Sequence, residues 1–136
     1  MFRYSLATHG SDWTYNDAHH FGWSTLSPLR VHTIEGAQEG KWREAARSFL
    51  EVQPENVYVA GFKTAEDGKG VILRLYEGAG LATNAVLNFN LPGVSLKAAM
   101  LCDGRERVLS PLAVDNNSLR MALKPWETST VRVQAD

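Results

Sequence analysis

Cysteine is almost absent from this sequence, and long apolar runs are absent altogether. Cys102 is the only cysteine in 136 residues, which excludes an internal disulfide bond and a zinc site built from several thiolates. Its neighbours are apolar, so we expect a buried, inert thiol. No apolar stretch approaches the roughly 18 residues that span a bilayer, and the first residues lack the apolar core of a signal peptide. The sequence therefore predicts a soluble, cytoplasmic chain without membrane contact.

An excess of basic residues is also missing. The chain has 14 Lys and Arg against 15 Asp and Glu, and the basic patch of a nucleic-acid-binding protein does not occur. Its apolar fraction of 44% and charged fraction of 21% are typical of globular proteins. The length fits one domain of ordinary size, so we expect a single domain over residues 1–136.

Short runs rich in β-branched and apolar residues dominate the sequence after residue 47. Between them lie turn-forming pairs and clusters such as Pro92-Gly93 and Asp103-Gly104, which tolerate positive φ or fix a bend. The runs cover residues 48–52, 57–63, 71–77, 85–91, 96–102, 118–123 and 128–133. Seven such runs predict an all-β fold, an antiparallel β-sandwich.

The first third of the chain has a different pattern. Residues 2–8 alternate as a half-buried strand does, and residues 13–21 fit a short helix that Ser11 or Asp12 could cap. Residues 27–47 follow neither period and predict a long connection between the two sheets. The fold class we expect is thus a sandwich with one short helix near the N-terminus.

The last two runs alternate most clearly. We expect the runs 118–123 and 128–133 to be antiparallel neighbours joined by residues 124–127. Their apolar side chains should face one another across the core: Leu119, Met121 and Leu123 on one side, Val131 and Val133 on the other.

The sequence offers no convincing catalytic or metal-binding group. Adjacent His19 and His20 would point about 100° apart on a helix, whereas a helical zinc pair needs i and i+4 spacing. We expect one of them to be half-buried and the other solvated. A relay of His9, Ser11 and Asp12 lacks the Gly-x-Ser-x-Gly turn that exposes a nucleophile.

The paired carboxylates Glu66 and Asp67 lie within a glycine-rich turn, where a solvated hairpin tip explains them. Glycosidase carboxylates flank a sugar in a concave site instead. We therefore assign no catalytic residue and no metal ligand in this chain.

Several segments together resemble the closing part of glycoside hydrolase family 38 α-mannosidases. The most specific is Leu-Arg-Leu-Tyr-Glu at residues 73–77, within 70–77. The others are 2–6 with His9, Gly10 and Trp13, then 28–29, 48–50, 101–103 with Glu106, and 125–128.

The resemblance implies a parent enzyme that hydrolyses α-mannosides with retention at a divalent metal site, zinc or calcium, in an N-terminal catalytic domain. None of that family's catalytic motifs matches a residue here, so no cofactor is expected in this chain. The resemblance implies a non-catalytic C-terminal domain, excised from a larger enzyme, whose partner and support is the catalytic domain of the parent chain.

Two other functions fit the residues. A free-standing carbohydrate-binding module would show an exposed row of aromatic side chains and bind mannose or mannobiose. A structural interaction domain would show neither.

The run 71–77 suggests one interaction surface. Alternation places Arg74 and Tyr76, with Ile72, on the face opposite to the core. We interpret Arg74 and Tyr76 as a possible interface with the rest of the parent protein, and we expect weak self-association when that partner is absent. The alternative is that Arg74 pairs with Glu77 or another acid of the same domain.

Overall fold

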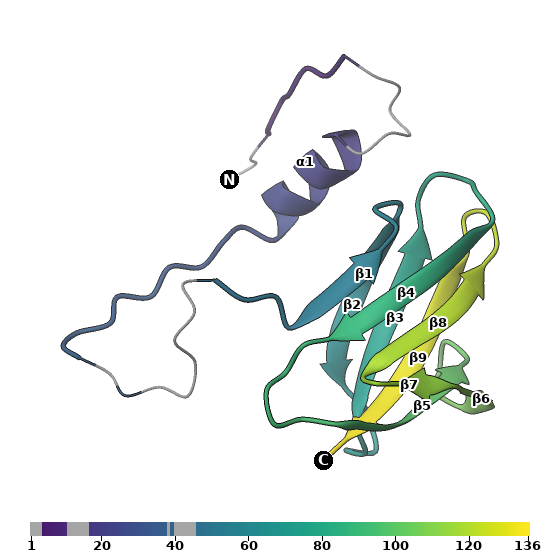
Figure 1. Cartoon of the computed structure of the whole chain (residues 1–136). Coiled ribbons are helices and arrows are strands. Elements are labelled where there is room, and N and C mark those ends of the chain that lie inside the picture. Colours follow the sequence, from purple (N-terminus) through teal and green to yellow (C-terminus); the bar gives the residue numbers. More distant parts are fainter. Residues whose placement is uncertain (1–3, 11–16, 38, 40–45) are drawn as a thin grey trace. The chain divides into compact units, whose positions relative to one another are not determined.

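The computed structural model describes residues 4–10, 17–37, 39 and 46–136. The chain divides into two compact units, Met1–Arg47 and Ser48–Asp136, and each is described by itself. Figure 1 follows the chain from the N-terminal helix into the strands of the second unit.

The first unit contains helix α1 (Asp17–Leu26). It ends where the amide of Ser27 donates to the carbonyl of Trp23 at 2.8 Å, directly before Pro28, which disfavours helical geometry in the preceding residue. The expected helix is confirmed for residues 17–21, and residues 13–16 lie outside the described part. The helix continues past Gly22 because a single helical glycine costs only about 1 kcal/mol.

The strand expected at residues 2–8 is wrong for the residues that the structure describes. Residues 4–9 have no regular structure, and the side chains of Tyr4 and Leu6 are 91% and 95% exposed. Alternation yields a strand only when a neighbour satisfies the backbone groups, and no strand lies before Leu50 among the described residues. For the same reason residues 27–47 do not connect two sheets.

The second unit is a β-sandwich of nine strands, all paired antiparallel. One sheet has the order β1-β4-β8-β7 and the other the order β2-β3-β9-β5-β6. The strands are β1 (Leu50–Gln53), β2 (Val57–Thr64), β3 (Val71–Glu77), β4 (Thr83–Phe89), β5 (Leu96–Cys102), β6 (Val108–Leu112), β7 (Val114–Asp115), β8 (Ser118–Leu123) and β9 (Thr128–Ala135). The predicted fold class, an antiparallel sandwich with one short helix near the N-terminus, is confirmed.

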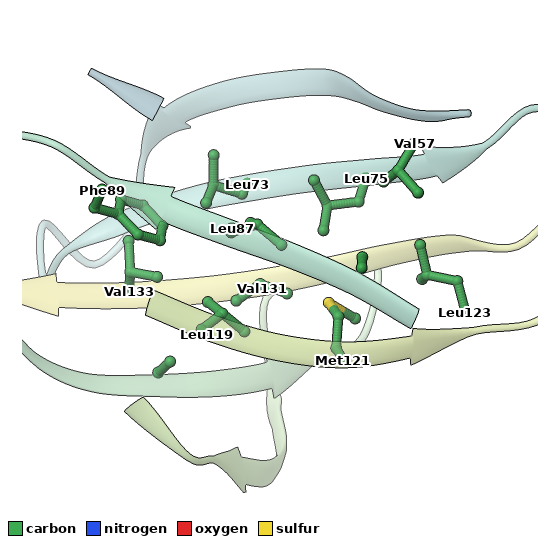
Figure 2. Packing of buried hydrophobic residues seen from close by; sticks show 12 residues of the cluster. Val57, Leu73, Leu75, Leu87, Phe89, Leu119, Met121, Leu123, Val131 and Val133 are labelled. Carbon is green, nitrogen blue, oxygen red and sulfur yellow. The ribbon is translucent and has the colours of Figure 1, made fainter. Parts of the chain in front are cut away.

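The core lies between the two sheets. Leu73, Leu75 and Val131 from the five-stranded sheet meet Leu87 and Leu119 from the four-stranded sheet, as Figure 2 shows. These five side chains are at most 1% exposed. Alternation along each strand puts one set of apolar side chains inward, and facing sheets bury both sets.

Strands β8 and β9 belong to different sheets, so the hairpin expected between them is wrong. Residues 124–127 instead carry the chain from one sheet to the other. The carbonyl of Glu127 accepts the amide of Glu77 at 3.0 Å, which binds this connection to the end of β3. The expected facing of Leu119, Met121 and Leu123 toward Val131 and Val133 is confirmed, since all five belong to the core.

Candidate functional site

A fully buried carboxylate lies at the end of β3. Glu77 is 0% exposed and shares the inward side of the strand with Leu73 and Leu75. Its carboxylate oxygens accept hydrogen bonds of 2.8 to 3.1 Å from the side-chain amide of Asn56 and from the backbone amides of Ala79, Gly80, Leu81 and Trp126. One side chain thus joins three separate connections of the sandwich.

These donors also determine the charge state of Glu77. Burial by itself raises the pKa of the carboxyl, but the bonds from the Trp126 amide, Asn56 and the amides of Ala79 and Leu81 outweigh burial and lower the pKa. The carboxylate is therefore ionised at neutral pH, and its charge is neutralised by aligned N–H dipoles.

The glycine that follows allows this arrangement. Gly80 has a φ of +71°, and a Cβ there would lie 2.6 Å from the indole ring of Trp126. A side chain at position 80 would push the Trp126 loop away from Glu77.

A second buried ionic cluster covers part of the outer face of the five-stranded sheet. Arg132 on β9 pairs with Asp67 at 2.7 Å and donates to the carbonyl of Glu106 at 3.2 Å. Glu106, only 5% exposed, accepts the Lys63 ammonium at 2.6 Å and the Glu66 amide at 2.9 Å. The turns that carry Asp67 and Glu106 close over this part of the sheet.

Ile72 lies between Lys63 and Arg132 in the register, which puts it on the outer face beside this cluster. Ile72 is nonetheless 0% exposed. The hydrogen bond from Lys63 lowers the pKa of Glu106 and raises that of Lys63, while the Lys69 amide and Arg132 lower the pKa of Asp67. These ion pairs connect the turns to the sheet, so we interpret the cluster as structural. Glu66 lies in solvent as expected, whereas Asp67 forms an ion pair with Arg132 of β9.

Arg74 lies on the same outer face, beyond the ionic cluster. It is exposed, its aliphatic stem passes over Gly61, and its guanidinium donates to the carbonyl of Gly104 at 3.3 Å. Tyr76, two residues on, is half-buried and lies opposite Tyr58 and Thr128 in the register. The structure thus puts both sequence-predicted residues on one face.

A groove of about 410 Å³ adjoins Arg74. Its walls include the Gly104 loop, Leu109 of β6, and Thr128 and Thr130 of β9. Leu109 is 62% exposed. Glu77 faces the opposite side of β3 and is surrounded by the donors named above, so the interpretation that pairs it with Arg74 is not supported.

The other candidate groups do not assemble into a site. His19 is half-buried and His20 exposed on α1, as expected, and Ser11 and Asp12 lie outside the described residues. Among the residues that the structure describes, no three His, Cys, Asp or Glu side chains are arranged to hold a metal ion.

Cys102 is buried, as predicted, and burial raises the pKa of its thiol. Within the described part of the chain, no helix is long and apolar enough to cross a membrane.

The aromatic row of a carbohydrate-binding module is not found in the sandwich. The exposed aromatic side chains there belong to different elements: Phe49 precedes β1, Phe62 is on β2 and Trp126 is in the loop before β9.

The chain was compared with models of known protein families. The model of the glycosyl hydrolases family 38 C-terminal beta sandwich domain matches residues 56–131, more than half of the chain. The matched segment includes Arg74, Glu77, Glu106 and Trp126, and hence both buried carboxylates. No curated protein matches the chain.

Proposed function

This chain belongs to the family of C-terminal β-sandwich domains of family 38 glycosyl hydrolases, and we propose that the enzyme it serves is an α-mannosidase. Within such an enzyme this is a non-catalytic domain, and its partner is the catalytic domain of the parent chain. The observation that carries the proposal is the match over residues 56–131. In this proposal the catalytic carboxylates and the divalent ion belong to the catalytic domain.

We assign the contact with the catalytic domain to the outer face around Arg74 and Tyr76. Three features support this assignment: an exposed guanidinium, a groove beside it, and the exposed Leu109 in the groove wall. A guanidinium can form a bidentate pair with a carboxylate of the catalytic domain. An apolar side chain inserted beside Leu109 would add buried area.

Activity measurements test the substrate class. We expect the parent enzyme to hydrolyse an aryl α-mannoside in preference to the matching α-glucoside. The isolated chain should hydrolyse neither substrate, with or without added zinc or calcium. A parent enzyme that prefers the glucoside would overturn the α-mannosidase proposal. Turnover by the isolated chain that a substitution within it abolishes would overturn the non-catalytic function.

Charge reversal tests the contact surface. Arg74→Glu in the parent enzyme is expected to lower the unfolding midpoint of the catalytic domain by roughly 3–5 °C, because a repulsive charge replaces an ion pair at the interface. Arg120→Glu, on the exposed face of the four-stranded sheet, is the matched control and should have little effect. Equal midpoints for the two variants would argue against the surface while leaving the enzyme class intact.

The isolated chain offers a second test of the same surface. Without its partner, the groove leaves apolar area exposed, and we expect weak self-association at millimolar concentration. Sedimentation velocity measures this over a concentration series, with Tyr76→Ser expected to reduce the association. A strict monomer that the substitution does not change would contradict the assignment.

A further inference from the structure

The outer face of the four-stranded sheet carries a second kind of surface, which the proposed function does not use. Its central strand β4 presents Asn84, Val86 and Asn88 outward. In the register, Val86 lies between Gln53 of β1 and Arg120 of β8. Amide and guanidinium groups therefore surround a small apolar floor.

Two outward asparagines in a central strand are unusual. Asparagine is depleted in strands because its side chain competes with the backbone for hydrogen bonds and packs poorly on a pleated surface. Asn84 and Asn88 nevertheless lie within β4. Asn84 pairs with Ala122 of β8 in the register, and Asn88 pairs with Glu51 of β1. An asparagine is expected at such a position when a bound molecule pairs with both the N–H donor and the oxygen acceptor of its side-chain amide.

A groove of about 660 Å³ lies at one side of this face, where β1 ends. Its apolar part consists of Val52, Pro54 and Val86, and its polar part of Glu51, Gln53, Glu55 and Asn84. The volume falls within the range of about 300–1,000 Å³ that is common for small-ligand sites. A volume of this size accommodates one or two sugar rings.

The polar groups of the groove restrict the ligand. Two carboxylates, Glu51 and Glu55, repel anions, and no group of three metal-ligating side chains occurs in the described part of the chain. Amide and carboxylate side chains match neighbouring hydroxyl groups, because each offers two polar atoms in one plane. Pro54 and Val86 can contact the C–H surface of a ring.

We propose that this groove binds one or two neutral hexose units of a glycan, held by their hydroxyl groups on Gln53 and Asn84. The site goes beyond the support of a catalytic domain and belongs to this chain alone. With no aromatic side chain in the groove wall, binding is weak, with a dissociation constant on the order of 1 mM.

Titration of the isotopically labelled chain with α-1,2-mannobiose tests the site by nuclear magnetic resonance. The expected result is saturable shifts of the backbone amide signals of residues 51–53, 55 and 84–88. Asn84→Ala should weaken binding about tenfold, the factor that corresponds to about 1.4 kcal/mol. Ser110→Ala, exposed on β6 of the other sheet, is the control and should bind as the unaltered chain does.

Glycerol at the same concentrations separates specific binding from a general effect of hydroxyl groups. Shifts that glycerol reproduces, that do not saturate, or that lie outside these residues would overturn the proposal, as would binding that Asn84→Ala leaves unchanged. Because the isolated chain is titrated and no hydrolysis is measured, these outcomes are independent of the activity of the parent enzyme.

Discussion

Glu77 is a buried charge whose partners are mostly backbone amides. Four of its five hydrogen-bond donors are peptide N–H groups, and the fifth is the side chain of Asn56. Removal of the carboxylate would leave those donors buried without a partner, which costs about 1–3 kcal/mol for each neutral group. The stability of the sandwich therefore depends on the ionised form of this residue.

The first prediction concerns pH. The pKa of Glu77 is lower in the folded chain than its ordinary value of 4.5. Ionised Glu77 therefore stabilises the fold fully above pH 4.5, and this stabilisation is lost as the pH falls through the folded pKa. Glu77→Gln is expected to cost roughly 2–4 kcal/mol at neutral pH. Urea unfolding from pH 7 down to about pH 3 measures the free energy of unfolding.

The difference between the variant and the unaltered chain should shrink toward the acidic end, because Glu77 of the unfolded chain takes up a proton before Glu77 of the folded chain does. Asp67 and Glu106, whose pKa values are also lowered, act with the same sign in both proteins and cancel. A constant difference over this range would contradict the stabilising charge.

The second prediction concerns Gly80. Gly80→Ala is expected to cost roughly 2–3 kcal/mol, because the new Cβ meets the Trp126 ring and the φ is positive. Gly68→Ala is the matched control: it has a φ of +72° but no atom within 4 Å. It should cost only about 1 kcal/mol. Thermal unfolding of both variants compares them, and equal losses would show that the close approach to Trp126 carries no energy.

Sequence reasoning reached Arg74 and Tyr76 but not the buried acids. Alternation within one strand is enough to place a residue on a face, so the outward position of Arg74 followed from its neighbours. The burial of Glu77 depends on Trp126, 49 residues further on, and that of Glu106 on Glu66, 40 residues before it. Only Glu77 has a local sequence feature that could indicate its role, because Gly78 and Gly80 follow it and allow a tight loop around the carboxylate.

Strand positions were far easier to predict than strand partners. Each of the seven predicted runs overlaps a strand of the sandwich, because period-two alternation is a property of the segment itself. The partners of β8 and β9 were misassigned because alternation does not distinguish a hairpin from a connection between sheets. Strand β6 was missed because Pro111 interrupts its pattern, and β7 because it has only two residues.

The third prediction compares two leucines in strands. Leu87→Ala, at a 0% exposed position of β4, is expected to cost about 3 kcal/mol because it leaves a cavity between the sheets. Leu109→Ala, at a 62% exposed position of β6, should cost less than about 1 kcal/mol. Urea unfolding of the isolated chain measures both, and similar losses would contradict the position of the core.

At the scale of the whole molecule, the apolar core formed by the described residues lies entirely within Ser48–Asp136. The fourth prediction is that this segment folds when residues 1–47 are removed. Its free energy of unfolding should stay within about 1 kcal/mol of that of the full chain. Urea unfolding followed by circular dichroism measures it, and a segment without a cooperative transition would contradict the prediction.

The assignment to a family was the sequence inference with the widest reach. The segments that carry the resemblance within residues 56–131 fall inside the family match. The other segments lie before it, so the match does not test them: 2–6 with His9, Gly10 and Trp13, then 28–29 and 48–50. That the chain was excised from a larger α-mannosidase, and that residues 1–136 form a single domain, stay predictions.

The outermost strands of both sheets are interrupted or short. In the four-stranded sheet, β1 is followed at once by Pro54 and β7 has two residues; in the five-stranded sheet, β2 has a bulge between Val59 and Gly61, and β6 contains Pro111. A long, regular outer strand would offer its free N–H and C=O groups to another molecule and allow aggregation. None of the four edge strands is both long and regular. The sandwich is therefore protected against growth into β-rich fibres even when it is separated from its parent enzyme.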